Sequence, residues 1–182
     1  MQITKTKLPG VVLIEPKVFE DDRGFFFESY HKRLFDEQGI SLEFVQDNHS
    51  HSKQGALRGM HYQIRQPQGK LVRVVIGEIF DVAVDLRKSS PTFGEWVGVY
   101  LSAENKKQIY VPPGFAHGFY VMSEWAEVLY KTTDYYAPQW ERTLLWNDSR
   151  INIAWPLLDG IHPILSPKDE MGLPLDQADV YE

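Results

Sequence analysis

Short apolar runs separated by glycine and proline turns dominate most of the chain. Residues 71–76 and 79–86 form the clearest pair, with only Gly77 and Glu78 between them. In the second run, apolar side chains at even positions from Phe80 alternate with mostly polar side chains at odd positions from Asp81, which is the period-2 pattern of a half-buried strand. The pair predicts two tightly joined strands.

Similar short runs recur along the chain, at residues 11–14, 25–30, 42–47, 57–65, 96–101, 107–111, 118–122, 126–133 and 142–146. Ten or more short strands with glycine and proline turns between them are typical of a β-sandwich or a β-barrel. The sequence therefore predicts an all-β fold.

One short peripheral helix is predicted from Tyr30 to about Gln38, with Ser29 as its N-cap and Gly39 at the left-handed position after its end. From residue 147 the alternation stops and prolines recur. We expect one domain over residues 1–182, in which residues 147–182 form an extension of extended chain and turns around the barrel.

Composition narrows the possible functions. The 182 residues include 19 Lys and Arg against 25 Asp and Glu, a net charge of −6, which argues against nucleic acid or an anionic membrane as a partner. The chain has no cysteine, so disulfides, thiolate catalysis and Cys-ligated metals are excluded. The N-terminal residues lead to no apolar signal core, and no later stretch is apolar over the length of a membrane-spanning helix. We expect a cytoplasmic protein.

His61 is the first candidate for chemistry, in the run Leu57-Arg58-Gly59-Met60-His61. A histidine among apolar strand residues is more often a hydrogen-bonded structural group than a catalyst. Strict alternation places Arg58 and His61 on opposite faces, but a bulge at Gly59 would turn both toward one cavity. A neutral imidazole there is available as a general base.

Three further side chains have a structural and a chemical interpretation each. Lys70 either extends to solvent at the start of a strand or projects into the barrel. The second follows if the face that it shares with Val72 and Val74 lines the barrel, and its ammonium would then stabilise an oxyanion. Tyr130 packs in a strand or donates a proton. Asp169, in a Ser-Pro-Lys-Asp capping box, either only caps a helix or also orients a histidine.

Residues 112–119 contain Pro-x-Gly-x-x-His ending at His117, one of two short signatures of the cupin superfamily. Many cupins bind a metal through a His-x-His pair, and His49 and His51 form such a pair. No glutamate follows that pair at the usual short distance, so we expect no metal. Arg23, in an Asp-Arg-Gly turn, either only forms a turn or also binds phosphate.

Together these motifs resemble the dTDP-4-dehydrorhamnose 3,5-epimerase family over nearly the whole chain. The matching segments are residues 22–28, 44–50, 57–61, 69–73, 80–85, 113–119 and 165–169. The resemblance implies a cupin double-stranded β-helix, or jelly-roll barrel, with a few short helices. It also implies a homodimer without cofactor or metal, which epimerises dTDP-4-dehydro-6-deoxy-D-glucose at C3 and C5 for dTDP-L-rhamnose biosynthesis and hence for O-antigen or cell-wall polysaccharide.

The resemblance also assigns roles to individual residues. His61 is the base and Asp169 its orienting partner, Lys70 stabilises the enolate, and Tyr130 returns a proton. Positions that contact the nucleotide diphosphate or the sugar are Arg23, Glu28, Gln46, Asp47, Asn48, Arg58, His117, Tyr136, Glu141 and Lys168. Phe26 or Tyr136 is expected to stack on the base.

Three alternatives remain open at this point. One is a sister reaction on a dTDP-4-keto-6-deoxy sugar, either epimerisation at C3 alone or a shift of the ketone between C3 and C4. Another is a metal-dependent cupin, and the third is a cupin that binds a sugar without catalysis.

Overall fold

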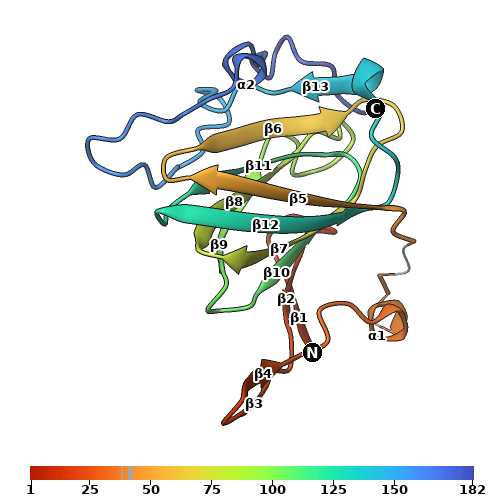
Figure 1. The fold of residues 1–182 in the computed structure, drawn as a ribbon. Coiled ribbons are helices and arrows are strands. Elements are labelled where there is room, and N and C mark those ends of the chain that lie inside the picture. Colours follow the sequence, from red (N-terminus) through yellow and green to blue (C-terminus); the bar gives the residue numbers. More distant parts are fainter. Residues whose placement is uncertain (38, 41–42) are drawn as a thin grey trace.

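The computed structural model describes residues 1–37, 39–40 and 43–182, and strands make up most of it (Figure 1). The strands are β1 Gln2–Lys5, β2 Val12–Glu15, β3 Phe19–Asp21, β4 Gly24–Phe26, β5 Gln46–Lys53, β6 Leu57–Gln63, β7 Lys70–Ile76, β8 Glu78–Asp85, β9 Trp96–Ser102, β10 Gln108–Val111, β11 Phe115–Val121, β12 Trp125–Thr132 and β13 Glu141–Thr143. The helices are α1 Lys32–Glu37, the 3₁₀ turn η1 Pro138–Trp140 and α2 Pro167–Glu170.

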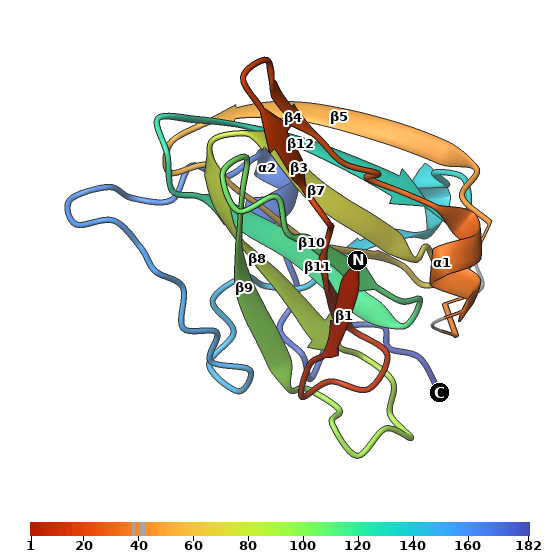
Figure 2. The same cartoon turned by 90° about the horizontal axis from the view of Figure 1, so that it is seen from below.

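Two antiparallel sheets face each other across the main core. One has the strand order β1-β2-β10-β7-β12-β5 and the other β13-β6-β11-β8-β9 (Figures 1 and 2). Apolar residues from both sheets, such as Val72 and Val128 of the first and Ala83 and Phe119 of the second, form one buried cluster between them. This two-sheet architecture confirms the all-β jelly-roll prediction.

The five-stranded sheet is covered on its outer face as well. Met60, Val82 and Val84 pack there against Ile151 and Leu175, which belong to the C-terminal segment. The prediction that residues 79–86 are half-buried is therefore wrong, because both faces of β8 are buried. The two aspartates of this strand, Asp81 and Asp85, are completely buried.

The strands β7 and β8 are tightly joined, as predicted, but they do not pair with each other. The chain passes from one sheet to the other at Gly77, whose φ is +76°. An added Cβ there would lie 1.9 Å from the carbonyl oxygen of Trp125, so only glycine fits this crossing.

The polar strand β5 differs from the sequence expectation. A strand was expected at residues 42–47, but β5 runs from Gln46 to Lys53 and lies at the edge of its sheet. Leu42 lies outside the described residues. Apolar alternation fails to reveal this strand because its inward side chains line a polar cavity and its outward ones meet solvent.

The helix α1 begins later than expected, at Lys32. His31 precedes it, and its Nδ1 accepts a hydrogen bond from the backbone N–H of Leu34 at 3.4 Å, so Ser29 is not the cap. The expected end at Gln38 lies outside the described residues. Within the described part of the chain, no helix is long and apolar enough to cross a membrane.

Candidate active site

A cavity of about 360 Å³ opens between the two sheets. Arg58 and His61 of β6 and His117 of β11 line it from the five-stranded sheet, and Lys70 of β7 and Tyr130 of β12 line it from the six-stranded sheet. Ten of the residues singled out in the sequence line this cavity: Gln46, Asn48, Arg58, His61, Lys70, His117, Tyr130, Tyr136, Glu141 and Lys168.

An irregularity in β6 turns two of these side chains to the same side. His61 pairs with His117 and Arg58 with Phe119, so three steps along β6 correspond to two along β11. Gly59 lies within this bulge with φ +119°, and an added Cβ would lie 2.6 Å from the Cα of Gly118. The bulge that the sequence suggested at Gly59 thus brings Arg58 and His61 to one cavity.

Asp169 lies directly behind His61. The Nε2–H of His61 donates to Oδ1 of Asp169 at 2.5 Å, and the carboxylate is almost fully buried. Ser166 Oγ donates to the other oxygen at 2.7 Å, within a capping box at the start of α2. Asp169 therefore caps a helix and orients a histidine at the same time, which leaves Nδ1 of His61 as the basic nitrogen.

The electrostatic environment favours a neutral imidazole. Burial lowers the pKa of His61 below its ordinary value of 6.5, the hydrogen bond to Asp169 opposes this, and the cations Lys168 and Lys70 lower it further. Burial raises the pKa of Asp169, but the hydrogen bonds from His61 and Ser166 outweigh it, so the pKa is lowered. His61 is therefore ready to accept a proton near neutral pH.

Lys70 and Tyr130 form the opposite wall. Lys70 Nζ lies 3.5 Å from the carbonyl oxygen of His61, and burial lowers its pKa to about 8. Burial also raises the pKa of Tyr130, which keeps its phenol protonated. The cavity thus has a base on one sheet, and an ammonium and a phenol on the other.

Charged and aromatic side chains, most of them exposed, line the rest of the cavity. Lys168 Nζ pairs with Oε1 of Glu141 at 2.7 Å, and the hydroxyl of Tyr136 donates to Oε2 of the same carboxylate at 3.0 Å. The guanidinium of Arg58 is held by Nε, which donates to Oγ of Ser52 at 2.8 Å. These side chains provide cationic groups and one exposed aromatic ring within an acidic protein.

A buried histidine–aspartate pair lies deeper in the barrel. His117 Nε2 lies 2.9 Å from both carboxylate oxygens of Asp81, which is completely buried on the inner face of β8. No role was predicted for Asp81 from the sequence, although its odd position in the alternating run was the available signal. Ser50, Gln63 and Gln68, which line the cavity as well, were also not predicted.

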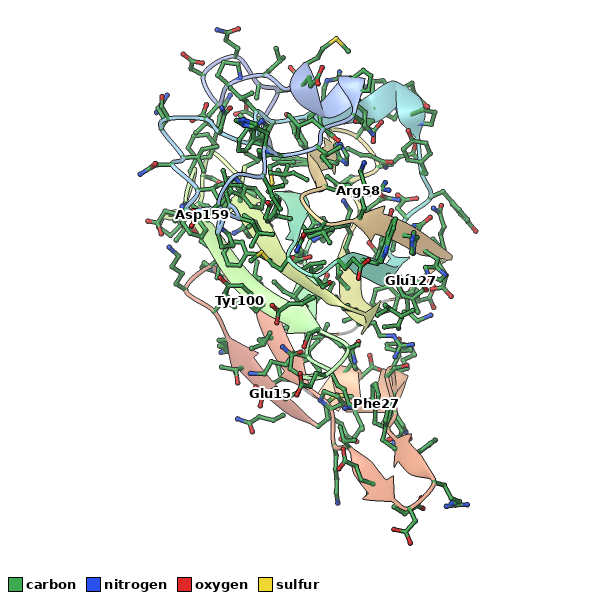
Figure 3. The ribbon with its side chains drawn as sticks, turned by 60° about the vertical axis from the view of Figure 1, so that its left-hand side comes forward. Glu15, Phe27, Arg58, Tyr100, Glu127 and Asp159 are labelled. Atoms are coloured by element: carbon green, nitrogen blue, oxygen red, sulfur yellow. The ribbon has the colours of Figure 1, made fainter. Side chains whose placement is uncertain are left out.

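Four residues that were expected to contact the substrate lie away from this cavity. Arg23 and Phe26 are on the hairpin of β3 and β4, a separate two-stranded sheet that projects from the body of the molecule beyond Phe27 (Figure 3). Arg23 pairs there with Asp21, and Glu28 follows the hairpin. Asp47 lies on the outer face of β5 and pairs with Lys131. One chain alone therefore does not bring these four to the cavity.

The His-x-His pair also faces outward. His49 and His51 contact the two carboxylate oxygens of Glu127 on β12, at 2.9 and 3.3 Å, on the exposed side of the sheet. Among residues 1–37, 39–40 and 43–182, no group of three His, Asp or Glu side chains could hold a metal ion. The pair therefore does not contribute ligands to the cavity.

Comparisons with known proteins identify the family. The family model of dTDP-4-dehydrorhamnose 3,5-epimerase matches residues 5–177. A protein of that name from Pseudomonas aeruginosa is 60% identical over 182 residues, which cover 100% of this chain and 99% of the relative.

Solved structures show the same fold. The epimerase of Legionella pneumophila, in complex with dTDP-4-keto-L-rhamnose, has a TM-score of 0.94 and 51% identity over 98% of this chain and 94% of its own. A 3′-monoepimerase from Streptomyces bikiniensis, in complex with dTDP-quinovose, has a TM-score of 0.87 and 34% identity over 94% and 86%. The chain therefore belongs to the dTDP-4-dehydrorhamnose 3,5-epimerase family and is an epimerase.

Proposed function

We propose that this protein converts dTDP-4-dehydro-6-deoxy-D-glucose to dTDP-4-dehydro-L-rhamnose by inverting C3 and C5. One observation carries the proposal: His61 and Tyr130 line a single cavity from facing sheets, with Lys70 in the same cavity. Inversion needs a base on one face of the sugar and an acid on the other, and these two strands supply them.

Proton removal is assigned to His61. The hydrogens on C3 and C5 both lie beside the C4 ketone, so loss of either proton leaves the electron pair in an enolate whose charge rests on one oxygen. Nδ1 of His61 takes the proton, because Nε2–H is already bonded to Asp169. Asp169 remains ionised and stabilises the imidazolium that forms.

Lys70 and Tyr130 complete the cycle. The ammonium of Lys70 stabilises the enolate oxygen, and one cation serves both steps because both enolates share that oxygen. Tyr130 donates its phenolic proton to the opposite face of the carbanion carbon, which re-forms the ketone with inverted configuration. Proton exchange with solvent then restores neutral His61 and the Tyr130 phenol. No electron transfer is needed, so the proposal includes no cofactor and no metal.

The nucleotide is assigned to the exposed side of the cavity. Arg58 and Lys168 line the cavity, and we assign them to the diphosphate. We assign the exposed ring of Tyr136 to stacking on the thymine, and Gln46, Asn48 and His117 to polar contacts with the substrate. Local cations of this kind bind a polyanionic ligand despite the net charge of −6.

We also propose that the protein is a single-domain homodimer that works in the cytoplasm. A two-stranded hairpin is marginally stable on its own, and the β3–β4 hairpin exposes Phe19, Phe25 and Phe26. A second copy packed on it would cover these rings. It would also explain why Arg23 and Phe26 lie far from the cavity of their own chain.

Solvent deuterium incorporation tests the catalytic assignment. The protein is incubated in D₂O with dTDP-4-dehydro-6-deoxy-D-glucose, and NMR follows C3 and C5 separately. We expect deuterium and inverted configuration at both carbons. His61→Asn should lower both exchange rates by about 10²–10⁴, the usual contribution of a general base. Tyr130→Phe should retain more exchange than inversion, because His61 can return solvent deuterium to the face it deprotonated.

Each alternative predicts another outcome. Exchange at C3 alone would identify a 3-epimerase, and a ketone that moves to C3 would identify a ketoisomerase. Binding without exchange would identify a sugar-binding protein, and activity that requires an added metal would identify a metal-dependent cupin. Equal loss of exchange and inversion in Tyr130→Phe would contradict the assignment of Tyr130 as the acid.

A further inference from the structure

Three glutamines hold the backbone of the loop that carries Tyr136. This loop, residues 133–137, which we call the Tyr136 loop, connects β12 to η1. The glutamines come from different parts of the chain: Gln46 begins β5, Gln63 ends β6, and Gln68 lies just before β7. All three line the cavity.

Their hydrogen bonds reach four successive residues of the loop. Gln68 Nε2 donates to the carbonyl oxygen of residue 134 at 2.8 Å, and Gln63 Nε2 donates to that of residue 135 at 3.3 Å. Gln46 Oε1 accepts from the backbone N–H of Tyr136 at 3.0 Å, and Gln63 Oε1 accepts from that of residue 137 at 2.8 Å. Each polar end of Gln63 therefore binds the loop.

Gln63 is the most constrained of the three. It is only 4% exposed, and its Nε2 also donates to the carbonyl oxygen of Gln66 at 2.7 Å. A buried amide with both ends hydrogen-bonded has one stable orientation, because any rotation leaves polar atoms without partners. The strand that carries Arg58 and His61 thus also holds the Tyr136 loop.

Packing alone does not hold the Tyr136 side chain. The residue is 51% exposed, and among the described residues its hydroxyl forms one hydrogen bond, to Glu141. An exposed ring is an effective stacking surface only if its orientation is set before the ligand binds. Otherwise the entropy lost in ordering the ring reduces the favourable free energy of binding. The backbone bonds from the glutamines provide that orientation.

We propose that Gln63, together with Gln68, is a positioning residue that fixes Tyr136 as the stacking surface for the nucleobase. This inference rests on the proposed function, in which Tyr136 contacts the nucleotide. It extends the site from side chains that touch substrate to buried amides that act through the loop backbone.

The test compares Gln63→Glu with Gln54→Glu. The first substitution keeps the shape of the side chain but replaces the donor to residues 66 and 135 with an acceptor. Gln54 makes the matched control, because its Nε2 also donates to a backbone carbonyl, that of Met122 at 2.9 Å, yet it does not line the cavity. A further variant, Gln68→Met, removes one loop contact at a less buried position.

We expect Gln63→Glu to raise KM for the dTDP-sugar and Kd for dTDP about tenfold, and Gln68→Met about threefold, with kcat within about threefold of wild type. Gln54→Glu should leave both constants unchanged. Thermal unfolding identifies variants that fail to fold. If Gln63→Glu is one of them, the effect of Gln68→Met on KM and Kd tests the inference instead.

A double-mutant cycle separates positioning from general destabilisation. In a Tyr136→Ala background, Gln63→Glu or Gln68→Met should change Kd for dTDP by less than about twofold, because the group they position is gone. Equal effects in both backgrounds, or a kcat loss without a KM change, would overturn the inference. Failure of the wild-type protein to bind dTDP would instead overturn the proposed function.

Discussion

The ammonium of Lys70 and the imidazole of His61 share one cavity, and each changes the ionisation of the other. Burial lowers the pKa of Lys70 to about 8, while the carboxylates of Asp81 and Glu141 oppose that shift. Burial, and to a smaller extent the nearby lysines, lower the pKa of His61. The reactive combination, a neutral imidazole beside a charged ammonium, therefore exists between these two pKa values.

This combination predicts the pH dependence of kcat/KM. Activity should fall on the acid side as His61 gains a proton, below its ordinary pKa of 6.5. It should fall on the basic side at about pH 8, as Lys70 loses its proton. Lys70→Met should lower kcat by about 10²–10³ and remove the basic limb. A basic limb that persists unchanged in Lys70→Met would show that another group titrates there.

At the scale of elements, short local devices turn side chains toward the site. The bulge at Gly59 brings Arg58 and His61 to one side of β6, and the capping box of α2 brings Asp169 behind His61. Both devices were visible in the sequence. The contact between Asp169 and His61 was expected only from the family resemblance, because the two residues are separated by more than a hundred positions and no local pattern links them.

The turn after β8 shows how an element is stabilised by a buried carboxylate. Asp85 accepts hydrogen bonds from Arg87, Ser90 and Thr92, and its side chain is completely buried. Burial alone would raise the pKa of Asp85, but these donors outweigh it and lower the pKa to about 2. Because the folded pKa lies below the ordinary value of 3.8, the carboxylate stabilises the fold above that value.

Asp85→Asn should therefore lower the free energy of unfolding at neutral pH by about 2 kcal/mol. The difference from wild type should shrink as the pH falls from about 4 toward 2, because the wild-type carboxylate then becomes protonated as well. Urea unfolding of both proteins at several pH values measures this difference in the free energy of unfolding. Asp159→Asn, in an exposed loop, is the control. A difference that stays constant down to pH 2 would show that the ionised Asp85 carboxylate is not the source of the stability.

At the scale of the whole molecule, the cavity of one chain lacks part of the site that the family resemblance assigns. Arg23 and Phe26 lie on the exposed β3–β4 hairpin, which projects from the body of the molecule that holds the labelled Arg58 (Figure 3). In the proposed homodimer, the hairpin of one copy would complete the cavity of the other. Each active site would then need two chains.

Mixing two inactive variants tests this arrangement. Arg23→Ala and His61→Asn are each expected to be nearly inactive alone. Co-expressed, they should recover about a quarter of wild-type activity, because half of the dimers are mixed and each mixed dimer has one intact site. Light scattering establishes the oligomeric state. If dimers form without recovery, the hairpin does not serve the partner's cavity.

Much of the fold could be predicted because apolar alternation reports which strands have a dry face. It identified β7, β8 and β12, and it failed for β5, whose inward residues are polar. Similarly, motifs pointed to His61, Lys70 and Tyr130 as single residues. Gln63 was not predicted from the sequence because its proposed role depends on backbone atoms of a loop more than seventy positions away.

The sequence by itself determined that the chain is all-β, which residue types are available for proton transfer, and where the turns and caps lie. These depend on local backbone preferences and on period-2 patterns, which act over a few residues. Only the tertiary structure decided that the base and the acid lie on facing sheets, that β8 is buried on both faces, and that Arg23 lies outside the cavity. The pairing of strands depends on apolar faces from distant parts of the chain that become buried against each other. No local sequence pattern encodes that pairing.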